Sequence, residues 1–195
     1  RLVIRFVPRR RRIVAKNLAC CFPELDDKAR ACLANRHFAS LGIGFLDVGL
    51  AWWHSLPSLT PGLVVEGIEH LRQAQCSERG VLMLSSHTTQ LDLLGKLLQP
   101  LCEHHVMIRP QKNRFIEFFS AKKRKYEKSV LYQHEIRRLY TLLKQGESVL
   151  YFPDQDYGLK HGVMAPFFGK DTATVSAPER MVRRTGALVL PVFLY

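Results

Sequence analysis

The second half of the chain alternates short apolar runs with segments of helical periodicity. Val81–Leu84 is predicted to be a buried strand, Leu91–Leu98 a helix ended by Pro100, and Val106–Ile108 a second strand. Further helices are predicted over 113–128, 134–145 and 177–185, and further strands over 148–152 and 187–193. Because strands and helices alternate, we predict an α/β fold, with a mostly parallel sheet flanked by helices.

Two of these helices carry end signals. Ser176 and Glu179 have the spacing of a capping box at the start of one helix, and Gly146 follows the other as a C-cap.

A long helix is predicted before this region, from Asp26 onward. Apolar or aromatic residues recur along it every three or four positions, at Leu33, His37, Leu41, Phe45, Val48 and Trp52. Such a face normally packs against the rest of the domain, so Phe45, Trp52 and Trp53 are interpreted as core. The alternative is a lipid-facing helix, which Gly42, Gly44 and the paired tryptophans also suit.

The chain is strongly basic and has the composition of a globular protein. Its 195 residues carry a net charge of +12, and 47% are hydrophobic. Such charge favours an acidic partner: nucleic acid, anionic lipid or an acidic carrier protein. Residues 1–16 interleave arginines with apolar residues, which suits a membrane surface or, alternatively, a solvated basic arm. No nucleic-acid recognition motif accompanies the charge, so nucleic acid is not a predicted partner.

Cysteine and histidine spacing gives little support for a metal site. The five cysteines form no C-x-x-C pair, which argues against a disulfide framework or a zinc ribbon and favours a reducing compartment. His104 and His105 are adjacent and would point to opposite faces of a strand, so we expect a surface feature of an edge strand. G-x-S-x-G, H-E-x-x-H and G-x-x-x-x-G-K motifs are absent from the sequence.

Candidate catalytic residues follow the predicted strands. His87 and Asp92 follow the first, Arg109 the second, and Asp154 and Asp156 the third. Ligands of an open parallel sheet collect beyond the carboxyl ends of its strands, so we expect these groups to meet at one edge.

His87 and Asp92 have an H-x4-D spacing. If a helix starts at residue 88 or 89, Asp92 falls in its first turn and its carboxylate can reach the imidazole. The carboxylate would then fix the tautomer and leave the other ring nitrogen to take a proton from a hydroxyl. The alternative is purely structural, because Thr89 and Asp92 also have the spacing of a helix cap.

Several blocks in one order carry a family resemblance over nearly the whole chain. They are the H-x4-D pattern, Asn17–Glu24, Met107–Pro110, Tyr151–Gly158, Ala165–Gly169 and Leu190–Val192. Together they resemble the late acyltransferases of bacterial lipid A biosynthesis, the lauroyl/myristoyl acyltransferase family, within the H-x4-D/E lysophospholipid acyltransferases. The chain departs from that family in having Asp92 where Glu is more common. It also begins without the hydrophobic anchor usual there, so we expect a piece of a longer chain.

The resemblance implies an acyl carrier protein-dependent O-acyltransferase at the cytoplasmic face of the bacterial inner membrane. It would move a fatty acyl chain to a hydroxyl of a lipid A precursor without a cofactor or a metal. His87 and Asp92 would be catalytic, and Arg109, Arg114, Asp154 and Asp156 would contact substrates. The alternatives are an acyltransferase for a glycerophospholipid, mannosylated phosphoinositide or ornithine lipid, or a non-catalytic basic module that binds membranes.

The remaining expectations concern organisation and partners. Residues 1–56 are predicted to be a basic arm and amphipathic helix after a membrane anchor, and residues 57–195 a catalytic domain truncated at its C-terminus. A basic cluster, made of Lys122–Lys125, Lys128, Arg137 and Arg138, is either a docking face for an acidic carrier protein or a solvated surface. Phe167 and Phe168 are interpreted as core, with the lining of an acyl channel as the alternative.

Overall fold

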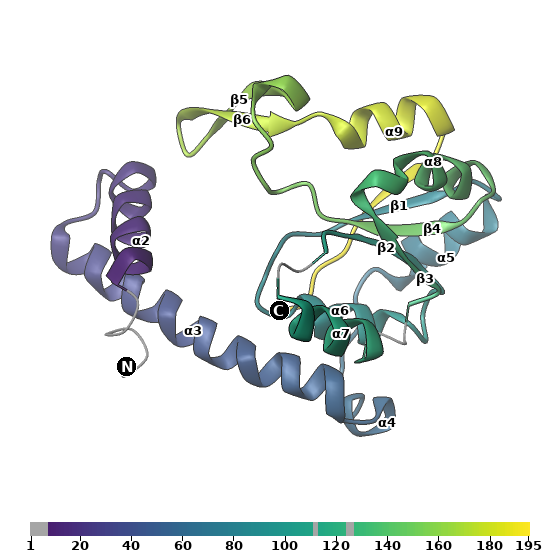
Figure 1. Ribbon diagram of the computed structural model, residues 1–195, viewed down its shortest axis with the longest axis horizontal. Coiled ribbons are helices and arrows are strands. Elements are labelled where there is room, and N and C mark those ends of the chain that lie inside the picture. The colour runs from purple at the N-terminus through teal and green to yellow at the C-terminus, as the bar shows by residue number, and fades with distance from the viewer. Residues whose placement is uncertain (1–7, 111–112, 124–126) are drawn as a thin grey trace.

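The protein is built around a five-stranded parallel sheet, shown in Figure 1. The computed structural model describes residues 8–110, 113–123 and 127–195. The strands are β1 (Val81–Leu84), β2 (His105–Ile108), β3 (Ser129–Tyr132), β4 (Ser148–Tyr151) and β7 (Leu188–Pro191), in the spatial order β3-β2-β4-β1-β7. The α/β fold class predicted from the sequence is confirmed.

Helices cover both faces of the sheet. On one face, α5 (Ile68–Cys76) and α6 (Leu91–Leu98) pack Leu71 and Leu98 against Val81, Met83 and other strand residues. On the other face, α8 (Ile136–Lys144) and α9 (Ala177–Thr185) pack Leu139 and Met181 against alternate strand positions. Successive side chains of a strand point to opposite faces, so a continuous apolar run such as β1 serves both cores.

The elements of the parallel sheet and its flanking helices were largely as predicted, except that one helix was predicted too long and one strand was missed. β1 and α6 have the predicted bounds, and Gly146 follows α8 with a φ of 82°. The predicted helix over 113–128 is α7 (Arg114–Lys123), and the edge strand β3 begins at Ser129, where no strand was predicted. Ser176 precedes α9 but makes no side-chain capping hydrogen bond, so the predicted capping box is not formed.

A two-stranded antiparallel hairpin was not predicted. It consists of β5 (Gly162–Phe167) and β6 (Lys170–Val175). Phe168 and Gly169 connect the strands with φ values of 50° and 67°, the positive pair that a tight two-residue hairpin turn requires. Phe167 and Phe168 are 60% and 49% exposed at this turn, so their interpretation as core was wrong. Phe168 instead makes an edge contact with Phe22, with ring centroids 5.1 Å apart.

Residues before the sheet form a helical arm, which runs in Figure 1 from the left of the picture to a position below the sheet. It comprises α2 (Pro8–Cys21), α3 (Asp27–Trp53) and the short α4 (Leu56–Leu59). Asp26 caps α3 by accepting a hydrogen bond from the backbone N–H of Ala29 (2.6 Å). In the part of the chain that the structure describes, no helix is long and apolar enough to cross a membrane.

The face of α3 that packs inward is not the one that the apolar periodicity predicted. The buried residues of α3 are Gly44, Asp47 and Ala51, whereas Phe45 is 78% and Trp53 62% exposed. The core interpretation of these two aromatic residues was therefore wrong. A side chain on Gly44 would meet Thr89, since an added Cβ would lie 2.4 Å from the Cβ of Thr89. The helix approaches α6 through small residues, which carry little apolar signal in a sequence.

The expectation that His104 and His105 lie on the surface of an edge strand was also wrong. β2 is an interior strand, and His104 and His105 are 0% and 4% exposed. Nδ1 of His104 donates to the carbonyl of Cys102 (2.9 Å), and Nδ1 of His105 lies 2.6 Å from Oγ of Ser129. Burial is the main cause that lowers the pKa of both imidazoles.

Candidate active site

His87 and Asp154 form a two-point contact at the carboxyl edge of the sheet. Nδ1 of His87 lies 2.6 Å from Oδ1 of Asp154, and the backbone N–H of His87 donates to Oδ2 (2.7 Å). Both carboxylate oxygens are thus used on one residue, which fixes the ring and its loop together. The two side chains are 38% and 36% exposed, so the pair is accessible.

The pair meets because adjacent strands carry it at equal positions. β1 and β4 are parallel neighbours in which Leu84 is paired with Tyr151. His87 lies three residues beyond Leu84, and Asp154 three residues beyond Tyr151. The ring centroids of His87 and the buried Phe152 lie 5.2 Å apart, so the phenyl ring packs against the imidazole.

Asp154 is ionised at neutral pH. Burial is the largest single influence on its pKa and would raise it, but the hydrogen bonds and charge of His87 together outweigh burial and lower the pKa. When the imidazole is neutral, the ionised carboxylate beside Nδ1 favours the tautomer with the proton on that nitrogen, so Nε2 has a lone pair that can accept a proton.

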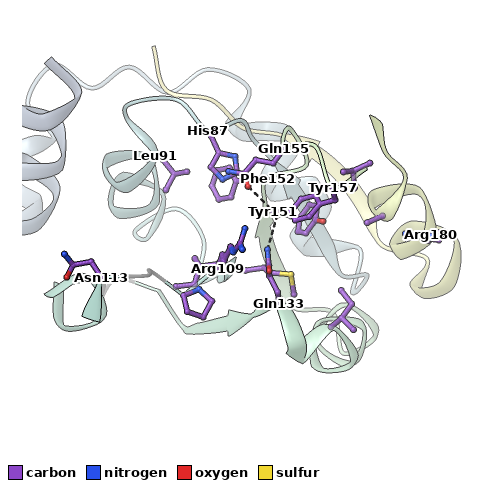
Figure 2. Close-up of a pocket in the computed structure, with 16 residues that line it drawn as sticks. His87, Leu91, Arg109, Asn113, Gln133, Tyr151, Phe152, Gln155, Tyr157 and Arg180 are labelled. Carbon is purple, nitrogen blue, oxygen red and sulfur yellow. Dashed lines mark hydrogen bonds between the residues drawn. The ribbon is translucent and has the colours of Figure 1, made fainter. Parts of the chain in front are cut away.

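A cavity of about 890 Å³ opens beside His87. Strand ends and the segments that follow them line it, including Ile108, Arg109, Tyr151 and Phe152. In Figure 2 the Arg109 side chain extends into the same space toward His87, while Asn113 and Arg180 lie at opposite ends of the cavity. The volume falls in the range of clefts that hold drug-sized or larger ligands.

The other predicted site residues are placed less centrally. Asp92 is partly buried in the first turn of α6, and the helix begins at Leu91 with Gln90 as its N-cap. Arg114 is exposed at the first position of α7. Oδ1 of Asp156 accepts a hydrogen bond from the backbone N–H of Gly158 (2.6 Å), which stabilises the turn after β4. The ring nitrogen Nδ1 of His87 is bonded to Asp154, and the role of Asp92 stays a prediction.

Several residues of the cavity wall were not identified from the sequence. The side-chain amide of Gln133 donates to the hydroxyl of Tyr157 (3.0 Å), and this hydroxyl points to Oε1 of Gln155 (3.5 Å), as drawn in Figure 2. Arg180, from α9, also lines the cavity. Gln133 directly follows β3, so the signal for it was the strand that the sequence analysis did not predict.

Among the residues that the structure describes, no group of three or more His, Cys, Asp or Glu side chains is placed to hold a metal ion. The site itself holds an imidazole bonded to a carboxylate, beside a large, partly apolar cavity that is also lined by a guanidinium. Such an arrangement can remove a proton from a hydroxyl and bind an anionic group next to it. The fold and the site together are those of an α/β enzyme.

Comparison with known proteins specifies this class further. The family described as bacterial lipid A biosynthesis acyltransferase matches residues 1–195, and the chain belongs to that family. It is 32% identical over 193 residues to the lipid A biosynthesis lauroyltransferase of Escherichia coli K12, which covers 98% of this chain and 63% of that protein. It is 33% identical over 192 residues to the palmitoleoyltransferase of the same organism (96% and 62%), and 29% identical over 180 residues to a lipid A biosynthesis acyltransferase of Haemophilus influenzae (90% and 56%). The chain thus spans less than two thirds of these relatives.

Proposed function

We propose that this protein transfers a fatty acyl chain from an acyl carrier protein thioester to a hydroxyl of a lipid A precursor. The observation that carries the proposal is the His87–Asp154 pair at the mouth of a cavity of about 890 Å³. Family membership supports the choice of an acyl acceptor related to lipid A. The proposed reaction requires no cofactor and takes place at the cytoplasmic face of the bacterial inner membrane.

The proposed mechanism uses His87 as the general base. Nε2 removes the proton of the acceptor hydroxyl, and the hydroxyl oxygen attacks the thioester carbonyl carbon. The tetrahedral intermediate collapses with cleavage of the carbon–sulfur bond, and the imidazolium returns its proton to the departing thiolate. The products are an ester and the thiol of the carrier. Asp154 stabilises the imidazolium in both steps because its carboxylate remains ionised beside Nδ1.

The developing oxyanion needs hydrogen-bond donors. The backbone N–H of His87 is already used by Asp154, so it is not available for this purpose. The proposal gives this role to the N–H groups of the first turn of α6, which starts at Leu91, four residues after His87. We assign Asp92, in the same turn and the acid of the H-x4-D pattern, to the site as its second carboxylate beside Asp154.

Cationic side chains provide the binding of phosphate groups in this proposal. Arg109 lines the cavity and presents a planar fork that suits a phosphate of the acceptor or of phosphopantetheine. Arg114, exposed at the start of α7, binds the same phosphate-bearing substrate outside the cavity. Asp156 stabilises the turn that places Tyr157 in the wall of the cavity. The carrier protein docks through basic surface residues that include Lys122 and Arg137. Residues 124 and 125 of the predicted cluster lie outside the described residues.

The proposal is tested by assaying the purified full-length protein against a panel of substrates. The panel combines an acyl carrier protein thioester or a coenzyme A thioester with a lipid A precursor, glycerol 3-phosphate, a mannosylated phosphoinositide or an ornithine lipid. We expect turnover with the carrier thioester and the lipid A precursor. Turnover restricted to coenzyme A and glycerol 3-phosphate would assign the chain to a different acceptor class, and no turnover with any pair would favour a binding module.

A further inference from the structure

The outward side of α3 is apolar over a long stretch. Between Phe38 and Trp53 the sequence contains one charged residue, Asp47, and that residue is 8% exposed. Large apolar side chains cover the outside of this stretch: Leu41, Ile43, Phe45, Leu46 and Trp53 are between 38% and 78% exposed. We call these five residues the apolar face of α3. A contiguous exposed surface of this kind marks a site that another apolar surface covers.

Basic side chains lie on the helix that precedes this face and on α3 just before the face begins. α2 runs alongside the first part of α3, as Figure 1 shows, and it carries the exposed residues Arg9–Arg12 and Lys16. Arg36 on α3 is also exposed, just before the apolar stretch begins. Cationic groups next to aliphatic and aromatic side chains, with tryptophan among them, match the boundary of an anionic bilayer, where head-group phosphates lie directly above hydrocarbon.

The apolar face is fixed relative to the catalytic loop. On the opposite side of the same helix, Gly44 packs directly against Thr89, two residues after His87. Nζ of Lys96 in α6 donates to the carbonyl of Ala51 (2.7 Å) and also to that of His54. α3 therefore joins α6 both at its middle and at its C-terminal end, and any surface that holds α3 also sets the orientation of the His87 cavity.

We propose that the apolar face of α3 and the arginines of α2 dock this protein on an anionic phospholipid surface, with the side chains of α3 inserted at the head-group boundary. Docking presents the cavity to an acceptor that remains in the bilayer, so this inference rests on the proposed function for its purpose. The physical contact does not depend on the reaction and is measured separately.

The test uses the two tryptophans of the chain as reporters. Trp53 is 62% exposed on the apolar face, whereas Trp52 is partly buried and its indole Nε1 is fully covered. W52F leaves Trp53 as the reporter, and W53F leaves Trp52. Each variant is mixed with vesicles of phosphatidylcholine and phosphatidylglycerol whose acyl chains are brominated near the head group. We expect strong quenching of Trp53, clearly weaker quenching of Trp52, and loss of quenching at high salt or without phosphatidylglycerol.

Charge substitutions provide the second measurement. F45E and L46E each place a carboxylate on the apolar face, and N35E places one at an exposed position of the same helix outside it. F45E and L46E should weaken vesicle binding about 10-fold or more, given the transfer free energy of one large apolar side chain, while N35E should bind within about 3-fold of the parent. Circular dichroism confirms that each variant is folded.

Three outcomes would overturn the inference. They are unquenched Trp53, equal effects of F45E and N35E, and a concentration-dependent dimer in the parent that F45E dissociates, which would assign the face to a second copy. The proposed function is judged by a different readout, turnover with detergent-dispersed substrates. F45E should retain this turnover, so loss of vesicle binding and loss of catalysis are distinguishable.

Discussion

The imidazole of His87 is held by the carboxylate of Asp154, which lies 67 residues away in the chain, at a distance of 2.6 Å. The same carboxylate also accepts the backbone N–H of His87, so the contact fixes both the tautomer and the loop. Asp92, the carboxylate that the H-x4-D pattern singles out, is close to His87 in sequence. Substitution of Asp154 and substitution of Asp92 are therefore expected to affect turnover differently.

Asp154→Asn should lower kcat at least about 100-fold, the lower end of what a positioned general base contributes, because an amide cannot stabilise the imidazolium. Asp92→Asn should cost less, since Nδ1 remains held by Asp154. His87→Ala should remove turnover at least as completely as Asp154→Asn. Steady-state rates of the three variants show which carboxylate supports His87 in the reaction. Near-normal turnover in Asp154→Asn combined with an inactive Asp92→Asn would return the dyad to the pair suggested by the sequence.

Arg109→Gln should raise KM for the phosphate-bearing substrate by about 10-fold or more with a smaller change in kcat, since a hydrogen bond to a charged group contributes about 1.5–3 kcal/mol. Arg183→Gln is a matched control, because Arg183 is exposed on α9 and pairs with Glu179 (3.6 Å). Equal changes in KM would mean that only the overall charge matters.

Gly44→Ala should destabilise the fold by about 1–3 kcal/mol, because its Cβ would lie 2.4 Å from that of Thr89. Gly42, in the same helix, has nothing within 4 Å of an added Cβ. Gly42→Ala should therefore be neutral or stabilise the protein by up to about 1 kcal/mol, through helix propensity. Urea unfolding of the two variants measures the difference, and equal stabilities would contradict the close contact of α3 with the loop that carries His87 and Thr89.

Acid should destabilise the protein through His104. Burial lowers its pKa in the folded state, partly offset by its hydrogen bond to Cys102. The unfolded chain therefore binds the proton first, and the free energy of unfolding should decrease as pH falls below about 6.5. His104→Asn cannot be protonated, so it should reduce this slope, whereas His37→Asn, exposed on α3, should leave it unchanged. Urea unfolding between about pH 7 and pH 5 provides the slopes, and parallel curves for parent and His104→Asn would refute the assignment.

The sequence predicted most strands of the parallel sheet and the helices between them better than it predicted the edge strand β3 and the β5–β6 hairpin. β1 and α6 were found with their bounds because a continuous apolar run and a helical period are local signals. β3 was missed because it is only four residues long and directly follows a basic segment, so its apolar pattern is a weak signal for a strand. The β5–β6 turn was missed because Phe168 is not a residue that favours positive φ.

Prediction of the site had a similar limit. His87, Arg109 and Asp154 were predicted to meet at one edge, because each follows a strand and the carboxyl ends of parallel strands lie together. The structure brings His87 and Asp154 into contact. Which carboxylate reaches the imidazole depends on strand order and register, which tertiary packing decides. The inward face of α3 was misassigned for a related reason, because close helix packing selected Gly44 and Ala51 over larger apolar residues.

The pairing of Leu84 with Tyr151 imposes a limit on how relatives of this protein can vary in length. One residue inserted between Leu84 and His87, or between Tyr151 and Asp154, would move that side chain by about 3.3 Å and turn it to the other side of the chain. Alignment gaps should therefore be rare in these two connections of two residues each, unless both change length together, and they should be tolerated in the β5–β6 turn.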